Sequence, residues 1–201
     1  MIFVLVVVLA YFLGGIPFGY LLVRWKSGVD IRSQGSGNIG ATNVLRTQGR
    51  AAGIATLLLD IGKGFLAVWI AAQLTGHSSW AVSLAAVAVM LGHSFPFLLR
   101  FRGGKAVACV VGAFLYLTPG ALGAVLLVFV VVVAWTRHIS LGSITGAAVL
   151  PLAVWLIALP PAPVEAASIL CGGFIIYRHR SNIQRLRAGT ENVFSFGSRK
   201  P

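Results

Sequence analysis

The amino-acid sequence predicts an all-α integral membrane protein with seven transmembrane helices. Of its 201 residues, 58% are hydrophobic and only 10% are charged, whereas a soluble domain carries roughly 25% charged residues. The apolar residues form long uniform runs and lack the alternating segments of about ten residues that mark an outer-membrane barrel, so the spans are expected to be helices. We expect one membrane-embedded domain over residues 1–201.

Each span is predicted from one apolar run between polar corners. The predicted spans are 2–23, 51–74, 80–99, two within 106–135, 141–159 and 164–177. The first run contains Gly14, Gly15 and Pro17, which membrane helices tolerate when neighbouring groups satisfy the freed backbone. It lacks a basic leading region and a small-residue cleavage pattern, so we interpret it as an uncleaved span.

The run 106–135 is too long for one span and is broken at Thr118-Pro119-Gly120. Lys105 before it and Arg137 after it are both expected on the cytoplasmic side, which requires two crossings. Each crossing is short for a hydrocarbon core of ~30 Å, so tilt or local thinning of the bilayer must compensate.

The basic residues fix the predicted orientation. Seven spans place every Lys and Arg except Lys63 on one side of the membrane. By the positive-inside rule, the N-terminus is extracytoplasmic and the C-terminus is cytoplasmic. The net charge of +12 is then explained by loops that meet anionic lipid headgroups and phosphate ligands. We therefore expect a membrane-lipid partner and no nucleic acid.

The sequence is poor in groups for metal or acid–base chemistry. Its four carboxylates are Asp30, Asp60, Glu165 and Glu191. They form no cluster for a two-metal site, no histidine pair has zinc-ligand spacing, and no aspartate stands five positions after a histidine. No serine lies in a nucleophile elbow. We expect no metal, no cofactor and no disulfide, because both cysteines lie inside apolar runs.

One polar stretch, residues 35–46, is rich in glycine and neutral hydrogen-bonding side chains. Its candidate ligand groups are Ser36, Gly37, Asn38, Thr42, Asn43 and Arg46. A glycine-rich turn exposes backbone N–H groups, and a helix N-terminus just beyond it adds positive partial charge. This pattern is typical of an oxyanion or phosphate cradle. A flexible polar loop between helices explains the same composition equally well.

A second basic corner follows the third span. Lys105 comes directly after Gly103 and Gly104 at a predicted helix start, where a lysine can meet a phosphate or act as a topology signal. We favour the phosphate. His93, near the cytoplasmic end of its span, either orients a ligand or a loop, or is a satisfied buried histidine.

Three further pairs of polar residues lie on or near the predicted spans. Ser140 and Ser143 flank a glycine at a helix start and act either as caps or as phosphate donors. His179 and Asn182 are three residues apart at the end of the last span. They either contact a ligand as a pair or belong to a solvated basic tail. Asp60 and Lys63 are also three apart inside a span, where unpaired charges are costly, so we predict an ion pair that supports the site.

Together these motifs resemble the bacterial membrane glycerol-3-phosphate acyltransferases that use acyl phosphate, the PlsY family. The resemblance covers nearly the whole chain. The motifs are GSGNxGATNxxR over 35–46, GHxFP over 92–96, FxGGKxVA over 101–108, SLGS over 140–143 and RHxxNxxRLxxGxE over 178–191. One departure is Ala106, where the family often has glycine; we expect altered local packing and unchanged chemistry.

The resemblance implies a seven-helix fold that transfers a fatty acyl group from acyl phosphate to the 1-hydroxyl of sn-glycerol 3-phosphate. The products would be lysophosphatidic acid and phosphate, made at the cytoplasmic face of the bacterial inner membrane by a protein we expect to be a monomer. By the family pattern, the residues that bind the phosphates or position the acyl carbonyl would be Ser36, Thr42, Arg46, Lys105, Ser143, His179 and Asn182. We expect Ser36, Lys105, His179 and Asn182 to be catalytic.

An acyl phosphate is already an activated anhydride, so positioning and charge stabilisation can supply most of the acceleration. The base is either His179 or a phosphate oxygen of the substrate, and we favour the substrate. Two other classes of function fit the composition. A transporter would need a polar pathway and internal symmetry, which the sequence lacks. A lipid-binding scaffold would leave the ordered glycine, serine and asparagine residues unexplained.

Overall fold

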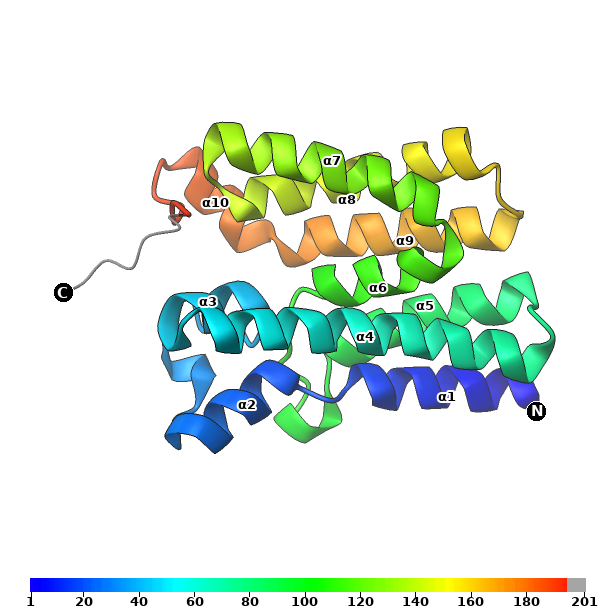
Figure 1. The fold of residues 1–201 in the computed structure, drawn as a ribbon, viewed down its shortest axis with the longest axis horizontal. Coiled ribbons are helices and arrows are strands. Elements are labelled where there is room, and N and C mark those ends of the chain that lie inside the picture. The colour runs from blue at the N-terminus through cyan, green and yellow to red at the C-terminus, as the bar shows by residue number, and fades with distance from the viewer. Residues whose placement is uncertain (195–201) are drawn as a thin grey trace. The chain divides into compact units, whose positions relative to one another are not determined.

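The computed structural model describes residues 1–194, and every regular element in that range is helical (Figure 1). The elements are α1 (Ile2–Gly14), α2 (Phe18–Ser27), η1 (Ile31–Ser33), α3 (Ala41–Gln48), α4 (Arg50–Thr75), α5 (Ser79–Ser94), η2 (Phe97–Leu99), α6 (Val107–Leu117), α7 (Pro119–Thr136), α8 (Ile139–Ala153), the π-helical η3 (Val154–Ala158), α9 (Ala162–Arg178) and α10 (Arg180–Arg187). The all-α prediction is confirmed.

Five helical segments within residues 1–194 are long and apolar enough to cross a membrane. They are Ile2–Ser27, Arg50–Thr75, Ser79–Leu99, Pro119–Thr136 and Ile139–Ala158. The run 106–135 is divided into α6 and α7, as expected, because Pro119 starts a new helix where its missing N–H is harmless. Seven crossings require α6 and α9 to span as well, and that count stays a prediction, as does the orientation of the termini.

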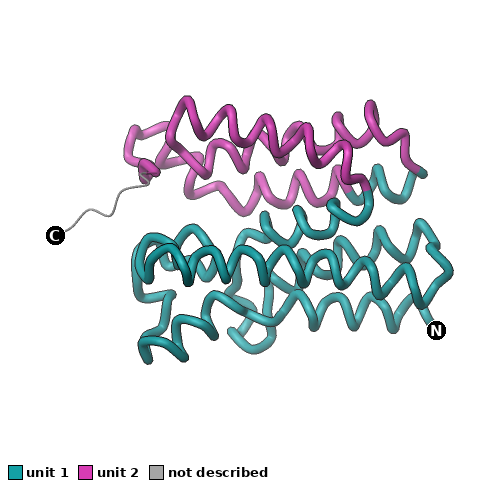
Figure 2. The backbone as a smooth tube through the Cα atoms, viewed as in Figure 1, with its two compact units in different colours: residues 1–117, 161–167 teal, residues 118–160, 168–201 magenta. Residues whose placement is uncertain are grey.

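The chain forms two compact units, which Figure 2 colours separately. Unit 1 comprises residues 1–117 and 161–167, and unit 2 comprises residues 118–160 and 168–201. Helix α9 contributes to both. The single-domain prediction is not tested by this division and stays a prediction.

The first predicted span is not one continuous helix. Helix α1 ends at Gly14, and α2 begins after Pro17, because proline removes a backbone donor and clashes with the preceding turn. At the break, the carbonyl of Ile16 accepts from the N–H of Phe18 at 3.1 Å and from the ammonium of Lys63 at 2.7 Å. The third segment, Ser79–Leu99, has the predicted length but is also broken, because α5 ends at Ser94 and the short helix η2 follows.

Glycines set the helix packing in unit 1. A Cβ on Gly14 of α1 would overlap the backbone of Val89 on α5, and one on Gly92 would overlap the carbonyl of Tyr11. Helix α4 packs in the same way against α6, where Gly64 meets the backbone of Cys109. Without a hydrophobic driving force between helices in lipid, close backbone approach through small residues supplies the packing.

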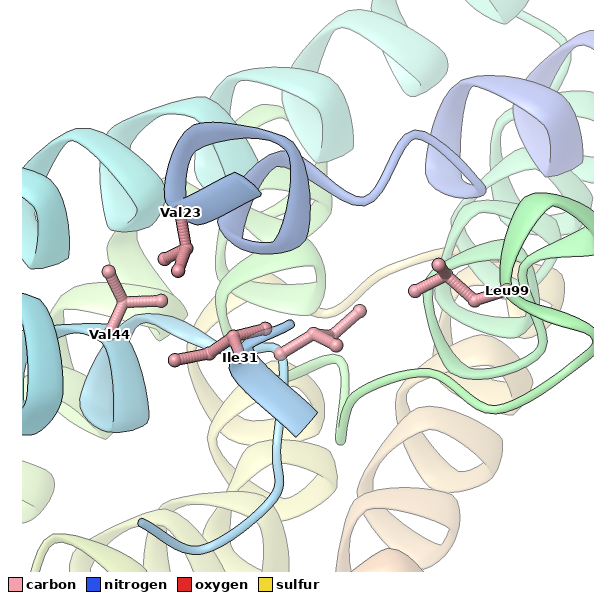
Figure 3. Packing of buried hydrophobic residues seen from close by; sticks show 5 residues of the cluster. Val23, Ile31, Val44 and Leu99 are labelled. Carbon is pink, nitrogen blue, oxygen red and sulfur yellow. The ribbon is translucent and has the colours of Figure 1, made fainter. Parts of the chain in front are cut away.

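A small hydrophobic cluster lies where α2, η1, α3 and η2 meet (Figure 3). Its members are Val23, Ile31, Ile39, Val44 and Leu99, each at most 4% exposed. Figure 3 shows the side chains of Val23, Ile31 and Val44 gathered together, with Leu99 reaching toward them from η2. This cluster anchors the polar loop 34–40 and the corner after α5 in the same part of unit 1.

Unit 2 is built on the antiparallel hairpin of α7 and α8, with α9 beside α8. Gly142 of α8 allows close approach to the side chains of Phe129 and Val133 on α7, and Gly172 of α9 meets the carbonyl of Ala147. Pro151 lies inside α8 and is followed by the π-helical η3, consistent with the disturbance that proline causes in the backbone hydrogen-bond pattern.

Candidate functional site

The first glycine-rich loop is organised by one buried side chain, Asn43, which is 2% exposed. Its Oδ1 accepts from the backbone N–H of Ser36 at 2.9 Å, while its Nδ2 donates to the carbonyls of Gln34 at 3.0 Å and Asn38 at 2.9 Å. An amide that meets three backbone groups fixes the path of the loop. Asn43 therefore fixes the conformation of the loop from its buried side.

The glycines of this loop are required by its conformation. Gly35 and Gly37 have φ values of 56° and 70°, which L-residues adopt only with strain, and a Cβ on Gly35 would also overlap Asn43 Oδ1. Asn38 Oδ1 accepts from the N–H of Gly40 at 2.8 Å, just before α3 begins. The loop thus delivers an exposed Ser36 and Gly37 beside the start of α3.

Arg46 and Thr42 lie on α3. Arg46 is exposed and Thr42 is half-buried, so both are on the surface side of this short helix. Before the loop, Asp30 caps η1 by accepting from the N–H of Arg32 at 2.9 Å. The hydrogen bond from the Arg32 guanidinium lowers the pKa of Asp30, so this capping group stays ionised at neutral pH.

The second glycine-rich corner is tied to the end of α5 by its backbone. The N–H of Gly103 donates to the carbonyl of Ser94, and the N–H of Gly104 donates to the carbonyl of His93, both at 3.1 Å. Lys105 follows, half-buried, two residues before α6 begins at Val107. Leu99 in η2 belongs to the cluster that holds Ile39 and Val44, so unit 1 brings the two glycine-rich motifs into one region.

The predicted pair of Asp60 and Lys63 is confirmed. Lys63 Nζ is 2.8 Å from Asp60 Oδ1, and His93 Nδ1 is 3.6 Å from the same oxygen. All three side chains are at most 5% exposed. His93 is therefore a buried histidine beside this ion pair, and a part in orienting a ligand or a loop stays a prediction.

The ligand atoms of Asp60, His93 and Cys109 lie within 4.8 Å of one another, a donor set that a divalent metal can use. The ammonium of Lys63 already balances this carboxylate at 2.8 Å, so a metal would have to displace a buried cation. The cluster suits an ammonium, and the expected absence of a metal stays a prediction.

In unit 2, Glu191 draws three elements together. Its Oε1 accepts from Ser140 at the start of α8 at 3.0 Å and from Asn182 on α10 at 2.7 Å. Its Oε2 accepts from Arg185 Nε at 2.7 Å. Burial alone would raise the pKa of Glu191, but the hydrogen bonds from these three partners outweigh it and lower that pKa. Glu191 is ionised at neutral pH.

His179 and Ser143 also make defined contacts in unit 2. His179, 3% exposed, places Nδ1 2.7 Å from the carbonyl of Ile175. Because a carbonyl only accepts, Nδ1 carries the proton, and in the neutral ring Nε2 carries the lone pair. Ser143 Oγ donates to the carbonyl of Ile139 at 2.9 Å. Neither Ser140 nor Ser143 caps α8, because the N-cap residue of this helix is His138 and no side chain caps it.

The predicted site residues therefore fall into two groups. Unit 1 holds Ser36, Gly37, Asn38, Thr42, Asn43, Arg46, His93, Gly103, Gly104 and Lys105, and unit 2 holds Ser143, His179 and Asn182. The sequence did not predict that Glu191 would accept hydrogen bonds from Ser140, Asn182 and Arg185. Its position nine residues after Asn182, in a chain with four carboxylates, was the feature that could have indicated this role.

The model of one protein family, described as glycerol-3-phosphate acyltransferase, matches residues 4–189. The chain belongs to this family. Similar curated relatives carry the same name: the protein of Geobacter sulfurreducens is 49% identical over 92% of this chain and 94% of its own length. The protein of Desulforamulus reducens is 46% identical over 98% of this chain and 96% of its own.

Two solved structures are similar to this acyltransferase family member over 96% of its chain. Both are crystal structures of PlsY (YgiH), an integral membrane glycerol 3-phosphate acyltransferase, and both are 39% identical to it. The glycerol 3-phosphate form has a TM-score of 0.91, and the form described as that of lysphosphatidic acid has a TM-score of 0.89. The resemblance found in the motifs is thereby confirmed, as is the integral membrane character.

Proposed function

We propose that this protein transfers a fatty acyl group from acyl phosphate to the 1-hydroxyl of sn-glycerol 3-phosphate, releasing lysophosphatidic acid and inorganic phosphate. The observation that carries the proposal is the similarity to PlsY in two forms, one with glycerol 3-phosphate and one with lysphosphatidic acid. Those two molecules differ by one acyl group, so they are the acceptor and the product of a single acyl transfer.

The choice of acyl phosphate as donor is supported by the groups that the chain offers. Its four carboxylates include no acid five residues after a histidine, and Asp60 and Glu191 are engaged in the contacts described above. A donor that is already an activated anhydride needs a site that places two anionic substrates and stabilises charge. Glycine-rich corners with a lysine and an arginine fit that need.

In unit 1, we assign phosphate binding to Arg46, Lys105 and the hydroxyl of the exposed Ser36, with the exposed Gly37 leaving room beside it. Arg46 offers a planar fork of donors and Lys105 a point charge, so both can neutralise phosphate oxygens. Thr42 adds a hydroxyl donor. Gly103 and Gly104 lack side chains, so a phosphate can approach the backbone beside Lys105. Asn38 and Asn43 bond to the loop itself, so we assign them to shaping the cradle.

In unit 2, we assign Asn182 and Ser143 to substrate binding. His179 is the side chain there that could act as a general base. The protonated Nδ1 of His179 faces a carbonyl, so Nε2 can accept a hydrogen bond or a proton from the glycerol hydroxyl. A phosphate oxygen of the substrate can do the same, and we favour it because the protein supplies few carboxylates.

The proposed setting is the bacterial inner membrane, with the site on the cytoplasmic face, the acyl tail in lipid and the protein acting as a monomer. The charge distribution supports this orientation, because the loops on the opposite side carry only His77 and Glu165 as titratable groups.

Acyl transfer by the purified protein in detergent tests the proposal, with acyl phosphate and glycerol 3-phosphate and no added metal. Lysophosphatidic acid and phosphate should appear in equal amounts. Product from acyl-CoA or acyl carrier protein alone would overturn the donor assignment. Uptake of labelled glycerol 3-phosphate into sealed proteoliposomes without product would overturn the enzymatic proposal in favour of transport.

A further inference from the structure

A charged group inside the apolar helices of unit 1 has no place in the reaction proposed above. Asp60, Lys63 and His93 are buried, with exposed side-chain fractions of 3%, 1% and 5%. Replacing a buried ion pair by apolar residues of similar volume is often neutral or stabilising. The energy of the ion pair itself therefore does not explain this group, whose purpose lies in the contacts that it makes with the backbone around it.

One part of that purpose lies at the break in the first span. Lys63 donates to the carbonyl of Ile16 at 2.7 Å and sits 5.5 Å from the centre of the Phe18 ring. The same carbonyl accepts from the N–H of Phe18 across the break at 3.1 Å, so the ammonium adds a second, charge-assisted hydrogen bond there. Lys63 thus ties α4 to the break after α1, and Asp60 balances its charge.

The other part concerns His93, whose ring lies between Asp60 and the backbone of Gly104. On one side, Nδ1 is 3.6 Å from Asp60 Oδ1. On the other, a Cβ on Gly104 would overlap Nε2. The imidazole is therefore packed directly on the residue that precedes Lys105, and the backbone bonds of Gly103 and Gly104 run to Ser94 and His93 themselves.

The corner that His93 supports is strained. Arg100, Phe101 and Ala106 all have positive φ values, of 52°, 62° and 63°. An L-residue adopts this region only at an energetic cost, and such conformations persist only where the surroundings hold them. A strained corner beside a lysine needs a rigid support if that lysine is to keep one position.

We propose that His93 is a positioning residue for Lys105. Fixed on one side by the Asp60–Lys63 pair, its ring holds the backbone of Gly104 and so sets where the Lys105 ammonium meets a phosphate oxygen. The proposal rests on the proposed function, because it takes Lys105 as the phosphate-binding cation. His93 itself touches no substrate in this scheme.

A double-mutant cycle in the acyl-transfer assay tests this role. His93→Ala should lower kcat/KM by at least ~10-fold in the native background, but by less than ~2-fold when Lys105→Ala is already present, since coupled residues are non-additive. Met90→Ala is the matched control. Met90 is 2% exposed on the same helix, and its truncation should multiply with Lys105→Ala. If His93→Ala does not fold, His93→Asn takes its place in the cycle.

Gly104→Ala supplies an independent steric test. It should lower kcat/KM by at least ~10-fold, and adding His93→Ala should cause no further loss, because the ring that the new methyl group overlaps is gone. Losses that multiply in both cycles, as they do for Met90→Ala, would overturn the positioning role and leave the proposed function standing. Near-normal activity of Lys105→Ala itself would overturn both.

Discussion

At the scale of single residues, the proposed chemistry depends on two cations. Lys105→Ala and Arg46→Ala should each lower kcat/KM by at least ~10²-fold, because each removes a group that stabilises phosphate charge. Arg102→Ala is the matched control: Arg102 is exposed in the same corner and lies outside the proposed site, so its loss should leave activity near normal. Near-normal turnover of both test variants would contradict the two-phosphate scheme.

His179→Gln separates the two possible bases. Glutamine keeps a hydrogen-bonding side chain and lacks a titrating lone pair. If a phosphate oxygen of the substrate takes the proton, we expect kcat and KM for glycerol 3-phosphate near those of the native protein. Steady-state kinetics with both substrates check this, and a fall in kcat with KM unchanged would identify His179 as the base.

Ala106 has a φ of 63°, in the left-handed region that favours glycine. Ala106→Gly should stabilise the protein by about 0–1.6 kcal/mol, since relief of ~1–2 kcal/mol of strain is offset by ~0.4–1 kcal/mol of unfolded-chain entropy. Thermal unfolding in detergent measures the effect. Ala113→Gly within α6 should be destabilising by comparison, by ~1 kcal/mol, and a destabilised Ala106→Gly would refute the strain argument.

At the scale of elements, Glu191 joins α8, α10 and the segment after α10. Its side chain is 6% exposed and accepts from Ser140, Asn182 and Arg185. Glu191→Gln should destabilise the protein at pH 7 by about 1.5–3 kcal/mol, the range for hydrogen bonds to a charged group. Unfolding temperatures of the two proteins, measured in detergent, give the comparison.

The pH dependence of that difference follows from the lowered pKa of Glu191. A carboxyl with a lowered folded-state pKa stabilises above its unfolded pKa, about 4.3, and loses that contribution as pH falls through the folded value. The gap between native protein and Glu191→Gln should therefore stay constant from pH 7 to 5 and shrink below pH 4. Asp30→Asn is the control with a smaller effect, because the Asp30–Arg32 pair is about one-third exposed.

At the scale of the whole molecule, the predicted orientation can be measured. Both native cysteines are buried, so cysteines introduced at exposed positions report alone. His77→Cys in the α4–α5 turn should react with an impermeant maleimide in intact cells, and Arg187→Cys on α10 only after permeabilisation. Labelling of both from the outside, or of Arg187→Cys alone, would contradict the seven-span topology.

Much of the architecture was predictable because the constraints are local. Long apolar runs with few charges require helices in a membrane, Pro119 divides α6 from α7, and a buried aspartate three residues before a lysine must form a pair. The break at Pro17 was not predicted, because its tolerance depends on Lys63 reaching Ile16 from another helix.

By itself, the sequence determined the all-α membrane class, the two glycine-rich corners and the motifs of an acyltransferase family, since each is written in neighbouring residues. Only the tertiary structure decided that Asn43 shapes the first loop from within, that Glu191 collects three donors, and that His93 stands between Asp60 and Gly104. These roles depend on contacts between residues far apart in the chain. A spacing pattern holds no information on which buried polar group will satisfy which distant partner.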